Sequence, residues 1–428
     1  MVTSKSIPTT FKYGLALYNY ADSDSRRTDN AIPFAEVIEQ ISPGVMRFPS
    51  GSESSSYLWA TAPDWVPSSH TPAFNTKARW PNADESIVNE NNAFVDAMNF
   101  DEFMKLANGS EVVITVNFDS MYADDGPSKE LLIETARQWV AYNKRMGYSV
   151  SYYEIGNESD MPTTFNGRPD NGIQYANDFV DFATAMREED DTILIGMNGY
   201  YEKFMTDVLN VAGEYVDFVS IHSFPIYGLM DGYEDYLRTG GYHYKIYNNF
   251  LAALSNSTMR QDRKDGIFAL FSETGVVDWA RINDEKSGWA GNTAGHMIAL
   301  FDVLGRIGEL ERVRGGILTW TSHWSDDRNG HDIFSMLDPT NRYRPTAYAL
   351  RLWASIGDVE RVIREETEDV IKFTARTSDG DKILVANKRN VIQDVKISLA
   401  FYAHSPESAD IYEIADSNVL PPYSIAII

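Results

Sequence analysis

Residues 152–158 have the sequence Tyr152-Tyr153-Glu154-Ile155-Gly156-Asn157-Glu158, a short run of β-forming side chains that ends in a glycine, an amide and a carboxylate. Residues 268–273, Phe268-Ala269-Leu270-Phe271-Ser272-Glu273, have a similar arrangement, in which an apolar run is followed directly by a glutamate. Runs of this kind alternate with helical patterns along most of the chain. Such alternation is typical of a parallel sheet that is covered by helices.

Eight β-type runs occur between about residues 11 and 350. They are Tyr13–Tyr18, Val45–Phe48, Val112–Asn117, Ser151–Ile155, Ile193–Met197, Phe218–His222, Phe268–Ser272 and Gly316–Trp320. Stretches between them have apolar residues at three- and four-residue spacing, which is typical of amphipathic helices: Phe100–Ala107, Leu131–Met146, Tyr175–Glu188, Lys203–Ala212 and Thr293–Ile307. Eight β–α units predict an α/β fold, a closed (β/α)8 TIM barrel that occupies residues 1–352.

The pattern changes after Trp353. Short alternating strands follow at Val370–Ala375, Lys382–Asn387, Val395–Phe401, Ser408–Glu413 and Tyr423–Ile428. We therefore expect residues 353–428 to form a small C-terminal β-sandwich. Because some 75 residues are few for an independent domain, we expect it to pack on the barrel and to be completed by a strand from the N-terminus.

Two other features of the chain lead to expectations. The stretch Pro49–Glu90 is rich in Ser, Pro, Asn and Trp, including Trp59, Trp65 and Trp80, and we interpret it as a loop over the barrel mouth. The charged runs at residues 187–191 and 364–366 are interpreted as exposed helix ends or loops without a chemical role.

Composition excludes several classes of protein. Hydrophobic residues make up 43% of the 428 residues, which is enough for a large core, and there is no cysteine to form disulfides or thiolate metal sites. A net charge of −25 repels nucleic acid and anionic membranes. No window is long and apolar enough for a membrane span, and residues 1–10 have no signal-like apolar stretch. We expect a soluble protein, either cytoplasmic or secreted with its signal outside this sequence.

The two strand-end glutamates carry the chemical hypothesis. In a barrel of this type, catalytic groups lie at the C-terminal ends of the strands, so Glu158 and Glu273 are expected to face one cavity. Carboxyl groups about 5 Å apart allow one to attack an anomeric carbon while the other protonates the leaving oxygen, with retention of configuration. A single strand-end glutamate is more often a structural ion-pair partner, but the pairing of two in register favours catalysis.

Together, Asn157-Glu158 on the fourth strand and Glu273 on the seventh resemble glycoside hydrolase clan A. The sequence is most similar to family 51 and its relatives, the arabinofuranosidases and endo-glycanases, with similarity to families 39, 30 and 79. Three stretches carry this resemblance: Val45–Gly51, Ile114–Asn117 and Tyr152–Glu158. The resemblance implies that Glu158 is the acid/base, Glu273 the nucleophile, and that Asn157 binds the sugar 2-hydroxyl.

Further residues are candidates for substrate binding. Arg47, at the end of the second strand, resembles the clan arginine that bonds to the nucleophile; the alternative is a salt bridge to Glu154. His222 and Tyr227, at and after the sixth strand, could orient a carboxylate or a sugar hydroxyl, although His222 could also be a satisfied core residue. Two aromatic residues at and beyond the eighth strand suit a sugar-stacking floor, with plain packing as the alternative: Trp320 and Trp324.

Other chemistries are not indicated. The sequence has no Gly-x-Ser-x-Gly elbow, no His-Glu-x-x-His motif and no phosphate-binding glycine pattern after the first strand. We expect no cofactor, no metal and a carbohydrate as the partner. The predicted function is a retaining glycoside hydrolase of a poly- or oligosaccharide, with endo-glycanase action expected. An exo-acting arabinofuranosidase-like enzyme and a non-catalytic carbohydrate-binding relative are the alternatives.

Overall fold

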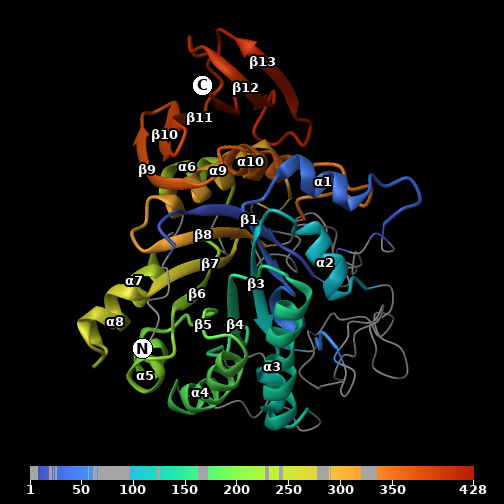
Figure 1. Cartoon of the computed structure of the whole chain (residues 1–428). Coiled ribbons are helices and arrows are strands. Elements are labelled where there is room, and N and C mark those ends of the chain that lie inside the picture. The colour runs from blue at the N-terminus through green and yellow to red at the C-terminus, as the bar shows by residue number, and fades with distance from the viewer. Residues whose placement is uncertain are drawn as a thin grey trace.

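A computed structural model describes the chain at residues 8–18, 22, 24, 27–55, 57–60, 65, 97–122, 126–161, 172–226, 231–240, 244–276, 289, 291–319 and 335–428. Eight parallel strands close into a barrel in sequence order, with β1 paired to β8 (Figure 1). The strands are β1 (Lys12–Ala16), β2 (Val45–Phe48), β3 (Glu111–Val116), β4 (Tyr152–Ile155), β5 (Leu194–Asn198), β6 (Phe218–Ser223), β7 (Phe268–Thr274) and β8 (Val313–Leu318). The predicted TIM barrel is confirmed.

Helices surround the barrel and follow most of its strands. They are α1 (Phe34–Ile41), α2 (Phe100–Leu106), α3 (Lys129–Met146), α4 (Gly172–Glu189), α5 (Glu202–Ala212), α6 (Tyr233–Thr239), α7 (Lys245–Asn256), α8 (Gln261–Gly266), α9 (Ala294–Gly308) and α10 (Pro345–Ala354). Two 3-10 turns, η2 (Gly51–Ser55) and η4 (Asp119–Tyr122), follow β2 and β3. All five predicted helices form, to within a few residues at their ends.

The barrel interior is filled by side chains, so the barrel is a packed core and not a channel. A buried apolar cluster takes members from every barrel strand: Ala16, Val45, Val113, Tyr152, Leu194, Phe218, Phe268, Leu270 and Ile317. The rings of Phe218 and Phe268 stack at 5.7 Å, and Tyr152 meets both edge-on. This packing fixes the strands rigidly beneath the ends that carry the candidate catalytic groups.

An antiparallel β domain follows the barrel, as predicted, and lies beside α9 and α10 at one end of the molecule (Figure 1). Its described strands form one sheet in the order β13-β12-β14-β11-β10-β9. The strands are β9 (Val359–Glu366), β10 (Val370–Thr377), β11 (Gly380–Asn387), β12 (Ile397–Tyr402), β13 (Tyr412–Ser417) and β14 (Ser424–Ile427). Near the N-terminus, Phe11 forms an antiparallel bridge to Val359. The domain boundary at residue 353 stays a prediction.

One charged run differs from its interpretation. Residues 364–366 are not an exposed helix end or loop, because they lie in β9. Arg364 donates from Nε to Oδ1 of the buried Asp302 on α9, at 2.8 Å. The run therefore joins the sheet to the barrel. The other charged run fits its interpretation, since it lies at the end of α4, which finishes at Glu189.

The sheet domain also contacts the first turn of α9. The backbone N–H groups of Ala294 and Gly295 donate to the carbonyls of Ser408 and Pro406, both at 2.8 Å. The first N–H groups of a helix have no partner within the helix, so these carbonyls satisfy two of them.

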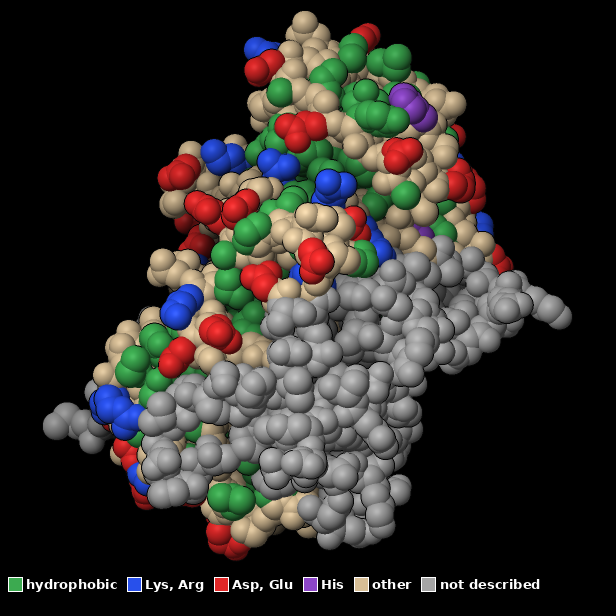
Figure 2. Space-filling model, turned by 90° about the vertical axis from the view of Figure 1, so that its right-hand side faces the viewer, with side chains coloured by type: hydrophobic (Ala, Val, Ile, Leu, Met, Phe, Trp, Pro, Cys, Tyr) green, Lys and Arg blue, Asp and Glu red, His purple; other side chains and the backbone are tan. Residues whose placement is uncertain are grey.

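Acidic and basic side chains are mixed on the described part of one face of the molecule. On this face, Figure 2 shows acidic side chains scattered among basic and apolar ones. Among the described residues, no helix is long and apolar enough to pass through a membrane.

Candidate active site

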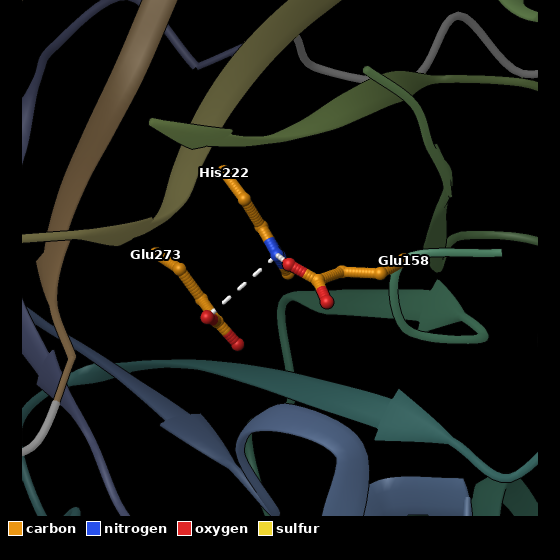
Figure 3. A group of neighbouring side chains, drawn as sticks. All are labelled: Glu158, His222 and Glu273. Atoms are coloured by element: carbon orange, nitrogen blue, oxygen red, sulfur yellow. Dashed lines mark hydrogen bonds and ion pairs between the residues drawn. The ribbon is translucent and has the colours of Figure 1, made fainter. Parts of the chain in front are cut away.

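Three predicted site residues lie together at the C-terminal ends of the barrel strands. Glu158 follows β4, His222 is in β6 and Glu273 is in β7, and their side chains converge in Figure 3. His222 Nδ1 lies 3.0 Å from Glu158 Oε1 and 3.7 Å from Glu273 Oε2. A carboxylate oxygen of Glu158 and one of Glu273 lie within 4.8 Å of each other.

The two carboxylates have different surroundings. The side chain of Glu273 is 6% exposed, whereas that of Glu158 is 29% exposed. Glu273 Oε1 accepts a hydrogen bond from Arg47 at 2.7 Å, which leaves Oε2 on the side of His222. Glu273 is therefore a buried carboxylate that contacts a cation, whereas Glu158 is the more accessible of the two to solvent and to a ligand.

Arg47 makes both of the contacts that the sequence left as alternatives. Besides its bond to Glu273, it donates to both oxygens of Glu154, at 2.8 and 3.2 Å, and from Nη2 to Asn157 Oδ1 at 2.7 Å. Burial acts to lower the pKa of the guanidinium, but the charges of Glu154 and Glu273 outweigh it and raise that pKa. Arg47, in β2, is therefore a fixed cation that joins Glu154 and Asn157, in and after β4, to Glu273 in β7.

His222 is enclosed by carboxylates. Burial of the imidazole acts to lower its pKa, but the charge of Glu273 and the hydrogen bond and charge of Glu158 together raise the pKa above its ordinary value. Nε2 lies 3.9 Å from Glu154 Oε1, too far for a hydrogen bond, and has no hydrogen-bond partner among the described residues. The ring therefore faces the candidate catalytic pair with Nδ1.

Asn157 presents an amide to the site. Its Oδ1 is taken by Arg47, and its Nδ2, although buried, has no hydrogen-bond partner in the described part of the chain. A buried amide N–H without a partner is costly, so a ligand oxygen would complete this group.

The turn between β4 and α4 has an unusual backbone. Gly156 and Glu158 have φ values of +81° and +51°. A Cβ at Gly156 would lie 2.3 Å from Ser159 Oγ, so only glycine fits there without displacing the hydroxyl. Glu158 is not a glycine, and non-glycine residues held at positive φ are strained and often functional.

Some of the predicted site residues lie outside the part of the chain that the structure describes. Tyr227, Trp320 and Trp324 lie outside the described residues, as does most of the stretch Pro49–Glu90. Within that stretch, Trp59 is fully buried and donates from Nε1 to the Thr135 carbonyl on α3, so this tryptophan belongs to the core.

The same three side chains are of the kind that bind divalent cations. Glu158, His222 and Glu273 are the one group of three or more potential metal ligands found among the described residues. Two carboxylates and an imidazole suit several transition metals as well as acid–base chemistry. The expectation that no metal takes part stays a prediction.

Two residues of the site were not predicted. Asp119 and Asn198 accept hydrogen bonds from the backbone of the β4–α4 turn. Polar residues just after β3 and at the end of β5 are the signals that could have indicated Asp119 and Asn198.

Comparisons with known proteins fit this architecture. No protein-family model and no curated protein sequence matches the chain, but solved structures do. A family 51 α-L-arabinofuranosidase from Bifidobacterium longum is 14% identical, covers 100% of this chain and 97% of its own, and has a TM-score of 0.66. A family 39 glycoside hydrolase from Bacteroides cellulosilyticus is 13% identical, with 100% and 82% covered and a TM-score of 0.56. A family 30 endoxylanase from Clostridium papyrosolvens is 13% identical, with 99% and 97% covered and a TM-score of 0.51. The resemblance to clan A is confirmed at the level of the fold.

Proposed function

We propose that the protein is a retaining glycoside hydrolase in which Glu273 is the nucleophile and Glu158 the acid/base. The observation that carries this proposal is the pair of carboxylate oxygens within 4.8 Å of each other at the ends of β4 and β7. Retaining glycosidases place their carboxyl groups about 5 Å apart, whereas inverting ones leave a wider gap for a water molecule. The shared fold with solved glycoside hydrolases supports the same reaction class.

The different surroundings of the two glutamates support these two roles. Glu273 is held by Arg47 through Oε1, so Oε2 is the oxygen that would attack the anomeric carbon. As that bond forms, the bond to the leaving oxygen breaks and Glu158 gives that oxygen its proton. Ionised Glu158 then takes a proton from water, the water oxygen attacks the anomeric carbon, and Glu273 leaves as a carboxylate.

The neighbouring groups have supporting roles in this proposal. His222 would donate from Nδ1 to Glu158 Oε1, at 3.0 Å, and so fix the orientation of that carboxylate. Asn157 Nδ2 would donate to a sugar hydroxyl. Arg47 would bind Asn157 and Glu273 at once and so keep the sugar-binding amide in register with the nucleophile.

Two substrate classes are open to this site. The whole-length likeness to a family 51 α-L-arabinofuranosidase favours an exo-acting furanosidase, while the likeness to a family 30 endoxylanase favours the expected endo-glycanase. A panel of aryl glycosides and polysaccharides separates them, because exo action releases single sugars and endo action releases oligosaccharides.

The proposal is tested by measuring hydrolysis and its dependence on the two glutamates. We expect at least one substrate of the panel to be hydrolysed, with the first-formed product keeping its anomeric configuration by NMR. Glu158→Gln and Glu273→Gln should lose activity. A matched control is Glu111→Gln, which changes a glutamate at the start of β3, at the other end of the barrel. Sugar binding without turnover would support the non-catalytic alternative and refute the proposal.

A further inference from the structure

The backbone around Glu158 is held from both sides by buried side chains. On one side, the N–H of Asn157 donates to Asp119 Oδ2 at 3.2 Å; on the other, the N–H of Ser159 donates to Asn198 Oδ1 at 2.6 Å. Asp119 begins η4, just after β3, and Asn198 ends β5. The strands on either side of β4 therefore each provide one acceptor to the turn that carries the candidate acid/base.

Ser159 ties the two acceptors together. Its hydroxyl donates to Asp119 Oδ2 at 3.0 Å and lies 3.2 Å from Asn198 Nδ2, and that same Nδ2 donates to the Ile155 carbonyl at 3.0 Å. Asp119, Ser159 and Asn198 are each no more than 2% exposed. Solvent therefore cannot replace these hydrogen bonds at low cost, and the turn has one well-defined conformation.

The turn needs such support because of its backbone. Glu158 has a φ of +51°, a strained conformation for a non-glycine residue that persists only where the surroundings enforce it. The two N–H groups next to Glu158 along the chain are the ones that Asp119 and Asn198 bind. Without these acceptors, the backbone can relax to negative φ, which would rotate the Glu158 carboxyl away from Glu273 and His222.

We propose that Asp119 and Asn198 are positioning residues that hold Glu158 in the orientation in which it can give up its proton. This inference rests on the proposed function, because it concerns the acid/base of that reaction. Both residues act through the backbone, since they accept hydrogen bonds from the N–H groups of Asn157 and Ser159, the two neighbours of Glu158 in the chain. Their loss should therefore resemble a partial loss of the general acid and not a loss of substrate binding.

The experiment compares leaving groups. The variants are Asp119→Ala, Asn198→Ala and the conservative Asn198→Asp, with Glu158→Gln as the reference. The matched control is Asn143→Ala, which removes another buried amide, bonded to the hydroxyl of Tyr153 in β4, away from the turn. The kcat/KM is measured for a dinitrophenyl and an alkyl glycoside of the sugar that the panel selects. A dinitrophenolate departs without a proton, whereas an alkoxide needs one.

We expect Asp119→Ala and Asn198→Ala to lose about tenfold to a hundredfold more activity on the alkyl glycoside than on the dinitrophenyl glycoside, the order expected when a general acid is displaced by about 1 Å. KM should change little, and Asn198→Asp, which keeps an acceptor for Ser159, should recover part of the loss. Equal losses on both substrates, or losses no different from Asn143→Ala, would overturn the inference.

A crystal structure separates failure of this inference from failure of the proposed function. If Glu158→Gln itself shows no leaving-group dependence, the acid/base assignment has failed. The φ of residue 158 in the crystal structure of a variant then tests the positioning role independently of the kinetics. A double variant, Asp119→Ala with Asn198→Ala, should show Glu158 shifted to negative φ. Retention of positive φ in that variant would refute the role of these two residues. If Asp119→Ala does not fold, Asp119→Leu, which also has no acceptor but keeps the size of the side chain, takes its place in the kinetic comparison and in the double variant.

Discussion

Replacing Gly156 with alanine tests how closely the β4–α4 turn is packed. A Cβ at this position would lie 2.3 Å from Ser159 Oγ, so the hydroxyl must move and lose its bonds to Asp119 and Asn198. Two lost hydrogen bonds cost about 2 kcal/mol together, and the φ of +81° adds about 1–2 kcal/mol for a side chain. Gly156→Ala should therefore lower the free energy of unfolding by about 3–4 kcal/mol.

Gly147→Ala is the matched control for this change. Gly147 ends α3 with a φ of +71°, and nothing lies within 4 Å of a Cβ there, so only the conformational part, about 1–2 kcal/mol, should be lost. The unfolding midpoint in urea measures both. In a Ser159→Ala background, the cost of Gly156→Ala should fall toward that of Gly147→Ala. Equal costs for the two glycine changes in the wild type would refute the packing argument.

The remaining predictions concern the site and its charges. Glu273→Ala should abolish turnover, and added azide should restore it with inverted product; a variant that keeps more than a small fraction of activity would remove Glu273 as nucleophile. Arg47→Met should lower the free energy of unfolding, measured with urea, by about 3–5 kcal/mol, because the buried carboxylates of Glu154 and Glu273 lose their cation. An unchanged free energy of unfolding would show that solvent reaches these two carboxylates. EDTA treatment should leave activity unchanged if the acid–base proposal holds, and a loss restored by one metal would favour a metal centre instead. Burial lowers the pKa of His296 to about 4. Between about pH 4 and 6.5, the unfolded chain therefore binds one proton more at His296 than the folded protein does. The contribution of His296 to the free energy of unfolding should be complete above pH 6.5 and should fall by about 3 kcal/mol as the pH drops toward 4. Urea unfolding at several pH values should show this dependence, and His296→Gln should reduce it.

The barrel could be predicted because its strands are short apolar runs separated by amphipathic helices. Strand β9 was missed because only Val359 and Val362 of its eight residues are buried, so its charged residues resemble a solvated loop. The contact of Arg364 with Asp302 depends on the docking of two domains, which spacing along the chain does not encode.

The meeting of Glu158 with Glu273 could be predicted because position at a strand end is visible in the sequence. Residues that act through hydrogen bonds to a neighbouring backbone are harder to identify. Asp119 and Asn198 have no motif of their own, and their role appears only when β3, β4 and β5 are placed side by side. Trp59 was expected in a loop over the barrel mouth, but it is buried in the core. An aromatic side chain in a long loop can pack into the core as readily as it can face a ligand.

The hydrogen bonds between the start of α9 and the carbonyls of Ser408 and Pro406 bear on how this architecture can evolve. A module that can be shuffled between proteins usually joins its neighbour through a linker with few contacts across it. Here the sheet domain supplies acceptors to a barrel helix, so each half carries part of what the other requires. Exchange of the sheet for one from a distant homologue would need matching carbonyls at the same places, and the two domains are therefore expected to diverge together and not to recombine freely.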